Sequence, residues 1–298
     1  CEAIVQVFDK YGDKKNRNKA RFKYVLDKLG LDKIKELYEE EFAALGNKTF
    51  PPIEIPKEEF IPNNLEFKIN DEFNSDPEFQ TWKNRNTCEQ KQSGYLNVQI
   101  KLALGDITSD KARIVANMAS NLGGGIIVNT VNQNMMIPWV KNEALSTFYA
   151  ELQKIDLHRA GTEEIRDITC CPGSETCNLG ITASRGLVKH LNEEMENGFP
   201  HSKELDHISI KASGCPNSCG QHHIASIGFH GGAKKLNGVL APHYEILLGG
   251  RIDEDKVIFG TSVIKIPAKN APQATRQVID SFKNHKLPNE SFGEFFDR

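Results

Sequence analysis

Two short stretches hold five of the seven cysteines of this chain: CCPGSETC at residues 170–177 and SGCPNSCG at residues 213–220. In both, the cysteines stand beside glycine, proline and serine, which favour tight turns. Two pairs of thiols on tight turns can converge on one site, and a 4Fe-4S cluster takes four cysteine thiolates as ligands. The two stretches therefore predict a four-thiolate centre, with an iron–sulfur cluster as the favoured occupant.

The grouped cysteines admit three other interpretations. Structural zinc also takes four thiolates, but its paired cysteines are usually separated by about two to four residues, and the gap between Cys171 and Cys177 is longer. Disulfides are disfavoured by the odd number of cysteines and by the cytosolic setting expected below. Inert buried cysteines commonly occur singly rather than grouped on turns. The cluster is favoured, and zinc stays open as the second interpretation.

The residues around the second stretch add local detail. A helix with Pro216 in its first turn would place Cys215 at the amino end of that helix, where unpaired N–H groups favour a thiolate. His222 and His223 follow shortly afterwards. We expect a packing role for these histidines, because four thiolates already satisfy a cluster.

Composition restricts the class of protein. The 298 residues include 37 Lys and Arg against 40 Asp and Glu, so no global field attracts nucleic acid or an anionic membrane. No apolar run approaches the roughly 20 residues that a bilayer helix needs, and the first residues do not resemble a signal peptide. We expect a globular, cytoplasmic protein. Because the chain opens with Cys1 rather than Met, an upstream portion is expected to be missing.

Helical and strand-like segments alternate along the chain. The apolar spacing of residues 14–45 predicts one or two amphipathic helices broken near Gly30, and the prolines of residues 51–62 predict an extended linker. Later segments mix both types, which indicates an α+β fold. Strands are predicted at residues 96–102, 126–131, 208–212, 225–229 and 244–248, and helices at residues 109–119, 144–155 and 274–284.

The spacing of the cysteines resembles the sulfite and nitrite reductase hemoprotein family, whose signature is Cys-x5-Cys followed by Cys-x3-Cys within Gly-Cys-Pro-Asn-x-Cys-Gly. Cys171, Cys177, Cys215 and Cys219 match this signature. The resemblance implies that these four bind one 4Fe-4S cluster. It also implies that the Cys219 thiolate, the catalytic residue, bridges the cluster to the iron of a siroheme. Cys170 lies outside the pattern.

Two further segments resemble cofactor-binding segments of the same family. Asn132, Gln133 and Asn134 match an Asn-Gln-Asn segment, whose amides suit the carboxylates of a macrocycle, although a polar turn would also explain them. A basic run near the amino end could form charge-assisted hydrogen bonds with siroheme carboxylates, or could simply be a solvated helix face. Its candidate residues are Arg17, Lys19, Arg21 and Lys23.

The resemblance implies an α+β architecture that is half of a pseudo-twofold reductase. Residues 1–50 would be the helical tail of a preceding, truncated siroheme domain, and residues 51–94 a linker or extended segment. A ferredoxin-like half-domain would follow at residues 95–160. An α/β-sandwich domain that binds the siroheme and the 4Fe-4S cluster would occupy residues 161–298.

The implied activity is that of an oxidoreductase, an assimilatory-type sulfite or nitrite reductase hemoprotein that forms sulfide or ammonia by six-electron reduction. Distal anion-binding residues would belong to the missing amino-terminal half, so this chain alone is expected to lack a complete anion pocket. Electrons would come from a ferredoxin or a separate reductase subunit, because no Gly-x-Gly-x-x-Gly motif is present. The alternatives are a dissimilatory sulfite reductase subunit, a non-catalytic zinc-stabilised binding module and an electron-transfer protein that holds only the cluster.

Overall fold

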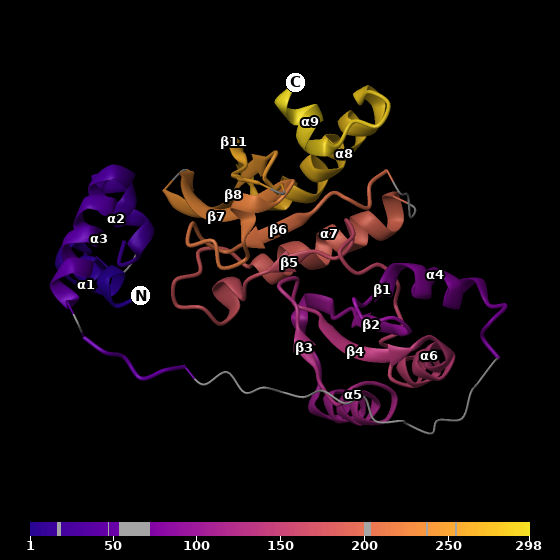
Figure 1. Ribbon diagram of the computed structural model, residues 1–298. Helices are drawn as coiled ribbons and strands as arrows, with labels where there is room; N and C mark the ends of the chain where they lie inside the picture. Colours follow the sequence, from indigo (N-terminus) through magenta and orange to yellow (C-terminus); the bar gives the residue numbers. More distant parts are fainter. Residues whose placement is uncertain (17–18, 47, 54–71, 200–203, 237, 254) are drawn as a thin grey trace. The chain divides into compact units, whose positions relative to one another are not determined.

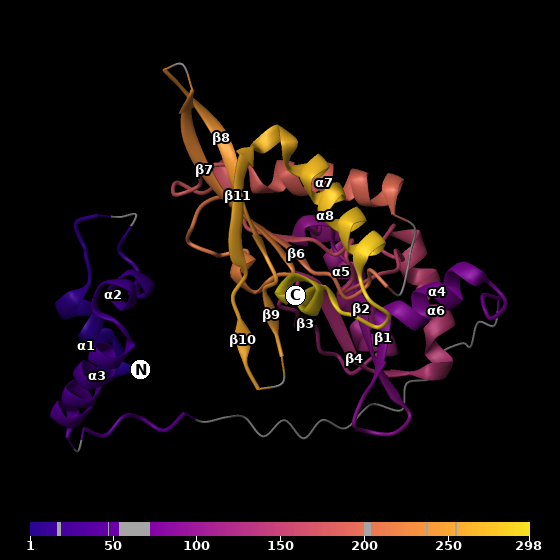
Figure 2. The same ribbon diagram turned by 90° about the horizontal axis from the view of Figure 1, so that it is seen from above.

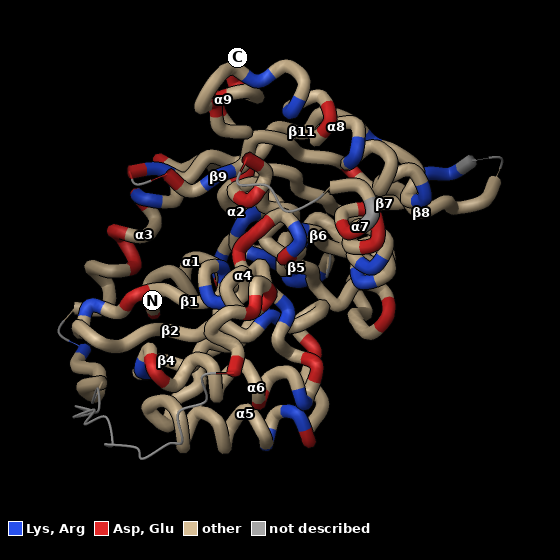
Figure 3. Tube along the Cα trace, turned by 90° about the vertical axis from the view of Figure 1, so that its right-hand side faces the viewer, with Lys and Arg blue, Asp and Glu red and all other residues tan. Residues whose placement is uncertain are grey.

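The computed structural model describes residues 1–16, 19–46, 48–53, 72–199, 204–236, 238–253 and 255–298. The chain forms two compact units, Cys1–Glu59 and Phe60–Arg298, and each is described by itself (Figure 1). No helix in the described ranges is long and apolar enough to cross a bilayer. Segments with Lys and Arg and segments with Asp and Glu are interspersed over the trace, in agreement with the near-neutral composition (Figure 3).

The first unit contains three helices, α1 (Glu2–Tyr11), α2 (Phe22–Leu29) and α3 (Leu31–Leu45). Their buried faces share a small apolar core formed by Val7, Val25, Ile34 and Leu37. Gly30 separates α2 from α3 with φ 80°, a conformation that glycine adopts without a steric penalty. The predicted break near Gly30 is confirmed.

A four-stranded antiparallel sheet forms the first layer of the second unit (Figure 1). Its strand order is β1 (Thr87–Glu89), β2 (Tyr95–Ile100), β4 (Met135–Lys141) and β3 (Val128–Asn129). Three helices supply the rest of its core: α4 (Pro77–Asn86), α5 (Ser109–Leu122) and α6 (Leu145–Lys154). Trp82, Phe148 and Tyr149 are fully buried there. Helix α4 and strand β1 lie inside the segment 51–94, and α4 begins with an Asp76 cap and Pro77.

A five-stranded mixed sheet forms the second layer (Figure 2). Its strand order is β11 (Thr261–Pro267), β8 (Val239–Leu248), β7 (Ile227–Leu236), β6 (Ile210–Ser213) and β5 (Thr169–Cys170). Strands β5, β6 and β7 are parallel, whereas β7 and β8 form a long antiparallel hairpin. The other elements of this layer are α7 (Ser184–Gly198), α8 (Ala271–His285), α9 (Phe292–Asp297) and the short strands β9 (Arg251–Ile252) and β10 (Val257–Ile258).

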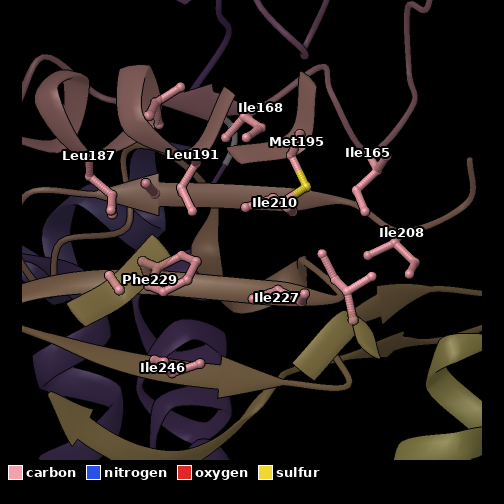
Figure 4. Packing of buried hydrophobic residues seen from close by; sticks show 14 of the residues in the cluster. Ile165, Ile168, Leu187, Leu191, Met195, Ile208, Ile210, Ile227, Phe229 and Ile246 are labelled. Atoms are coloured by element: carbon pink, nitrogen blue, oxygen red, sulfur yellow. The ribbon is translucent and has the colours of Figure 1, made fainter. Parts of the chain in front are cut away.

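Helix α7 covers the parallel part of this sheet. Leu187, Leu191 and Met195 are buried in the same cluster as Ile210 and Ile227 of the strands (Figure 4). Burial of apolar surface contributes about 25 cal/mol per Å², so the packing of α7 on the strands is the main contribution to the stability of the sheet. Because parallel strands need a crossover, α7 is the connection that lets β5 and β6 run side by side.

The predicted segments mostly match observed elements. Helices α5, α6 and α8 and strands β2, β6, β7 and β8 coincide with predicted segments within a few residues, apart from the longer β7–β8 hairpin. The strand predicted at 126–131 is shorter, because only Val128 and Asn129 pair with β4. Sequence reasoning missed the helices α1, α4, α7 and α9 and the strands β1, β4, β5, β9, β10 and β11.

Candidate metal centre

Both cysteine stretches begin where parallel strands end. Cys170 pairs with Ala212 in the register of β5 and β6, and the Cys171 N–H continues the ladder by donating to the Ala212 carbonyl at 3.1 Å. Cys215 follows β6 after one residue, Gly214. Because the strands are parallel, their carboxyl ends lie at the same edge of the sheet. Chain direction alone therefore brings the two stretches together.

Gly214 joins the two cysteine stretches. Its N–H donates to the Cys171 Sγ at 3.1 Å, and its carbonyl accepts from the Ile181 and Thr182 N–H groups at 2.8 and 3.0 Å. A Cβ atom on Gly214 would lie 2.7 Å from the Gly173 Cα, closer than real Cβ atoms approach backbone. The stretches are therefore interlocked at a point where only glycine fits.

The four motif thiols differ in exposure. Cys171 and Cys215 are buried, whereas Cys177 and Cys219 are exposed. Among the described residues, no three His, Cys, Asp or Glu side chains are grouped so that they could hold a metal ion. Zinc would need its four thiolates on one ion, whereas a 4Fe-4S cluster distributes four thiolates over four irons. Four thiolates from two interlocked stretches are the donor set that a 4Fe-4S cluster takes.

Cys170, the cysteine outside the motif, belongs to the core. Its side chain is 2% exposed and packs among the hydrophobic residues under α7. Burial raises the pKa of its thiol to about 12, so the thiol stays protonated at neutral pH. Its backbone is held from the other layer, because the Gln133 Nε2 donates to the Cys170 carbonyl at 2.7 Å and the Cys170 N–H donates to the Gln133 Oε1 at 3.2 Å.

A helix with Pro216 in its first turn is not observed. Pro216 lies in a turn, and the only regular element after it in the described part of this loop is a short 3₁₀ segment, His222–Ile224. The dipole of an α-helix is therefore not available to Cys215. The loop is instead fixed by Ser213, whose Oγ accepts from the Gly220 N–H at 3.1 Å and lies 2.8 Å from the His222 Nδ1. His222 is fully buried, as expected for a packing role.

The Asn132–Gln133–Asn134 segment lies between the two layers of the second unit. Asn134 is fully buried; its Oδ1 accepts from the Leu102 N–H at 2.9 Å and its Nδ2 donates to Asp167 at 2.6 Å. Burial raises the pKa of the Asp167 carboxyl, while the Glu163 N–H, Lys101 and Asn134 oppose that shift. The amides of Gln133 and Asn134 thus bond backbone groups and the Asp167 carboxylate, whereas the Asn132 Oδ1 accepts a hydrogen bond from a lysine.

That lysine, Lys211, is a feature that sequence reasoning missed. It lies in the buried strand β6, and its Nζ donates to the Asn132 Oδ1 at 2.9 Å and more weakly to Thr169 and Gln221 at 3.4 Å. Its three partners are neutral, and burial lowers the pKa of the ammonium group. The signal was present in the sequence as a single lysine inside the otherwise apolar or small run ISIKAS at residues 208–213.

The basic run belongs to the first unit. Arg17 lies outside the described residues. Lys19 precedes α2, Arg21 is the residue before its first turn, and the Lys23 Nζ lies 5.2 Å from the centroid of the Tyr24 ring. Their predicted contact with a cofactor stays a prediction, since each unit is described by itself.

Two family models match the chain. The model described as the nitrite and sulphite reductase 4Fe-4S domain matches residues 1–44 and 161–298, and the model of the nitrite/sulfite reductase ferredoxin-like half domain matches residues 89–155. Together they cover most of both layers of the second unit and most of the first unit, while α4 lies outside the matched ranges.

Curated relatives agree with these models. The chain is 25% identical over 282 residues to a ferredoxin–nitrite reductase of Synechococcus elongatus, covering 93% of this chain and 49% of the relative. It is 24% identical over 301 residues to a ferredoxin sulfite reductase of Mycobacterium tuberculosis, covering 99% of this chain and 50% of the relative. The chain thus spans about half the length of the curated relatives that it matches.

Solved structures support the same fold. The structure of the Mycobacterium tuberculosis NirA protein matches with a TM-score of 0.70 and 24% identity, covering 99% of this chain and 51% of that chain. A dissimilatory sulfite reductase, DsrI, matches with a TM-score of 0.58 and 12% identity over 68% of this chain and 66% of that chain. At these identities the similarity concerns the fold.

Proposed function

The chain belongs to the nitrite and sulphite reductase 4Fe-4S family, and from this premise we propose that it holds the siroheme and the 4Fe-4S cluster of an enzyme that reduces nitrite to ammonia or sulfite to sulfide. The observation that carries the proposal is the interlocking of the two cysteine stretches through Gly214. It holds Cys171 beside Gly214, the residue before Cys215, and so brings together two segments that are far apart in the sequence.

Cys171, Cys177, Cys215 and Cys219 would hold the cluster, and Cys219, which is exposed, would be shared with the siroheme iron. When bound, the two cofactors supply one-electron transfers, six for each nitrite or sulfite. The chain would position the ligands. The Gly214 N–H, which donates to the Cys171 Sγ, would fix the orientation of this one.

Lys211 and Asn132 are proposed to meet the anionic edge of the siroheme. Burial of an ammonium group is costly, and the Lys211 ammonium faces three neutral oxygens, of which only one lies closer than 3.4 Å. A carboxylate at the Lys211 ammonium would reduce this cost. Gln133 and Asn134 are assigned a different role, since their amides already tie the two layers together.

The electron donor is proposed to be a ferredoxin, because curated relatives are named as ferredoxin-dependent enzymes. The relatives include both nitrite and sulfite reductases, so both anions are proposed as substrates. A cytoplasmic location is proposed as well, and fractionation of the native cells would test it.

The experiment that tests the function is spectroscopic. Protein purified without oxygen after co-expression with siroheme synthesis is expected to show a porphyrin-type absorption band and about five irons per chain, four in the cluster and one in siroheme. Cys219→Ser should remove the coupling between the two cofactors, since its hydroxyl is a poor ligand for iron. Cys88→Ser, which changes an exposed cysteine outside the motif, is the control and should leave the spectrum unchanged.

Zinc in place of iron would contradict the proposal, and so would a spectrum unchanged by Cys219→Ser. Iron and sulfide without a porphyrin band would favour the electron-transfer alternative. With loaded protein and a reduced viologen dye, full turnover of nitrite or sulfite by this chain alone would contradict the expectation that its anion pocket is incomplete.

A further inference from the structure

Gln133 bonds the backbone directly before the first motif cysteine. It lies in the turn of residues 130–134, which joins β3 to β4 in the first layer. Strand β5 is the outermost strand of the second sheet, so one of its sides faces no further strand of that sheet. The Gln133 amide lies on this side, where its Nε2 donates to the Cys170 carbonyl at 2.7 Å and its Oε1 accepts from the Cys170 N–H at 3.2 Å. The side chain of Gln133 therefore takes the place of a further strand at Cys170.

The peptide unit between Cys170 and Cys171 is held at both of its ends. Neighbouring residues of a strand turn their backbone groups to opposite sides. The Cys170 carbonyl accordingly faces Gln133, whereas the Cys171 N–H faces β6 and donates to the Ala212 carbonyl at 3.1 Å. Because a peptide unit is planar and rigid, two hydrogen bonds on opposite sides fix the orientation of its plane. The Cα atom of Cys171 belongs to that plane and is fixed with it.

The other contacts of Cys171 come from its own layer. Its carbonyl accepts from the Ser184 Oγ at 2.7 Å, and its Sγ accepts from the Gly214 N–H at 3.1 Å. Gln133 adds a contact from the first layer, in which no motif cysteine lies. A displacement of its turn would thus reach Cys171 through the peptide unit.

The conformation of Gln133 is itself determined by its neighbours. Its φ of 66° lies in the left-handed region, which is uncommon for a residue other than glycine and persists where surrounding contacts determine it. Here the Gln133 N–H donates to the Thr130 carbonyl at 3.1 Å, and the Thr130 N–H donates to the Asn134 carbonyl at 2.8 Å. Gly105 lies directly against the side chain, since a Cβ atom there would be 3.0 Å from the Gln133 Cβ. The amide is therefore presented to Cys170 by a turn that is already ordered.

We propose that Gln133 is a positioning residue for the 4Fe-4S cluster: it holds the peptide unit before Cys171 and so sets the direction in which the Cys171 thiolate meets its iron. The inference rests on the proposed function, which makes Cys171 a cluster ligand. Gln133 acts through the backbone and touches neither the thiol nor the substrate. The first layer thereby becomes a part of the cluster site.

Alkylation of the full-length apoprotein tests this role without a cofactor. The protein is treated with N-ethylmaleimide, and the rate at each cysteine is followed by mass spectrometry. In Gln133→Met the side chain keeps its length but loses both hydrogen bonds, and we expect Cys171 to react about tenfold faster because its segment opens locally more often. Cys215, which is 8% exposed like Cys171, is the internal reference and should keep its rate.

The reference separates positioning from a general effect on stability. Equal acceleration at Cys171 and Cys215 would show that Gln133 only stabilises the fold, and an unchanged rate at Cys171 would also overturn the proposal. Gln80→Met is the matched control, since it removes a bond of 2.9 Å from the Gln80 Nε2 to the Asn74 carbonyl within the first layer, and it should change neither rate. If Gln133→Met does not fold, Gln133→Glu decides the test, because it keeps the shape of the side chain but loses the donor to the Cys170 carbonyl.

Loaded protein gives a second, spectroscopic measurement. Ferricyanide takes one electron from a 4Fe-4S cluster, which then releases one Fe²⁺ ion and becomes a 3Fe-4S cluster that is detected by electron paramagnetic resonance. A loosely oriented ligand gives up its iron more readily, so this form should appear at least about tenfold faster in Gln133→Met than in the wild type and in Gln80→Met. Equal rates in the three proteins would overturn the inference and leave the proposed function standing. A wild type that binds no iron would overturn the proposed function and this inference with it.

Discussion

Gly214 is the residue on which the two cysteine stretches meet, and its replacement is a sharp test of the interlock. A Cβ atom in Gly214→Ala would press on the backbone of Gly173 and Thr182, at 2.7 Å from each. We expect a loss of about 2–4 kcal/mol in the free energy of unfolding, measured by urea denaturation. Gly232→Ala, where a Cβ atom meets nothing within 4 Å, should change it by less than about 0.5 kcal/mol. Equal effects in the two variants would contradict the interlock.

Lys211 gives the protein a pH dependence with a definite sign. Because its pKa is lowered below 10.5 in the folded state, the unfolded chain binds more protons than the folded chain between the lowered value and 10.5. The cost of burying the ammonium is therefore complete below the lowered pKa and fades as the pH rises through it. The urea midpoint of the wild type should rise relative to that of Lys211→Met as the pH increases from about 7 toward 10.5. Lys189→Met, an exposed lysine on α7, serves as the control, and a difference that is flat with pH would refute the prediction.

Among the helices and strands, sequence patterns located those with a regular apolar period. Helix α8 was recognised from an apolar face that the structure buries at Ile279 and Phe282. Helix α7 was missed although Leu187, Leu191 and Met195 recur at helical spacing, because its sequence is rich in polar residues and ends beside a proline. Strand β11 was missed for another reason. It is an edge strand with five exposed residues at its start, so it shows no alternation of buried and exposed positions.

In the candidate site, too, sequence patterns located some of the residues and missed others. The motif cysteines were visible because spacing along the chain reflects local turns. Lys211 and the bonds of Gln133 and Asn134 depend on contacts between segments that are distant in sequence. No local pattern encodes such pairs. The contact predicted for the basic run likewise depends on how separate units are arranged, and no local pattern encodes that arrangement.

At the scale of the whole second unit, buried polar contacts join the two layers. Asn134 is central to them because its amide bonds both the Leu102 N–H and Asp167. Asn134→Ala would leave the Leu102 N–H and the half-buried Asp167 carboxylate without this partner, and we expect a loss of about 2–4 kcal/mol in the free energy of unfolding. Circular dichroism and the fluorescence of Trp82 and Trp139, both of which lie in the first layer, should then report separate transitions, whereas the wild type should unfold in one. Asn97→Ala, whose amide makes only a long contact to the Cys88 Sγ, is the control. A single, unshifted transition would show that the layers are coupled by other contacts.

The parallel pairing of β5 and β6 also sets an order of events during biosynthesis. Cys171 and Cys177 leave the ribosome well before Cys215 and Cys219, and the strands that carry them can pair only after α7 has crossed the sheet. Parallel pairing between distant segments is slow compared with local folding. The earlier thiols must therefore wait in a nascent chain without their partners, and an exposed thiol in that interval is vulnerable to oxidation. Metal insertion consequently depends on a nearly complete fold, and a chaperone or scaffold that shields the first pair would raise the yield of loaded protein.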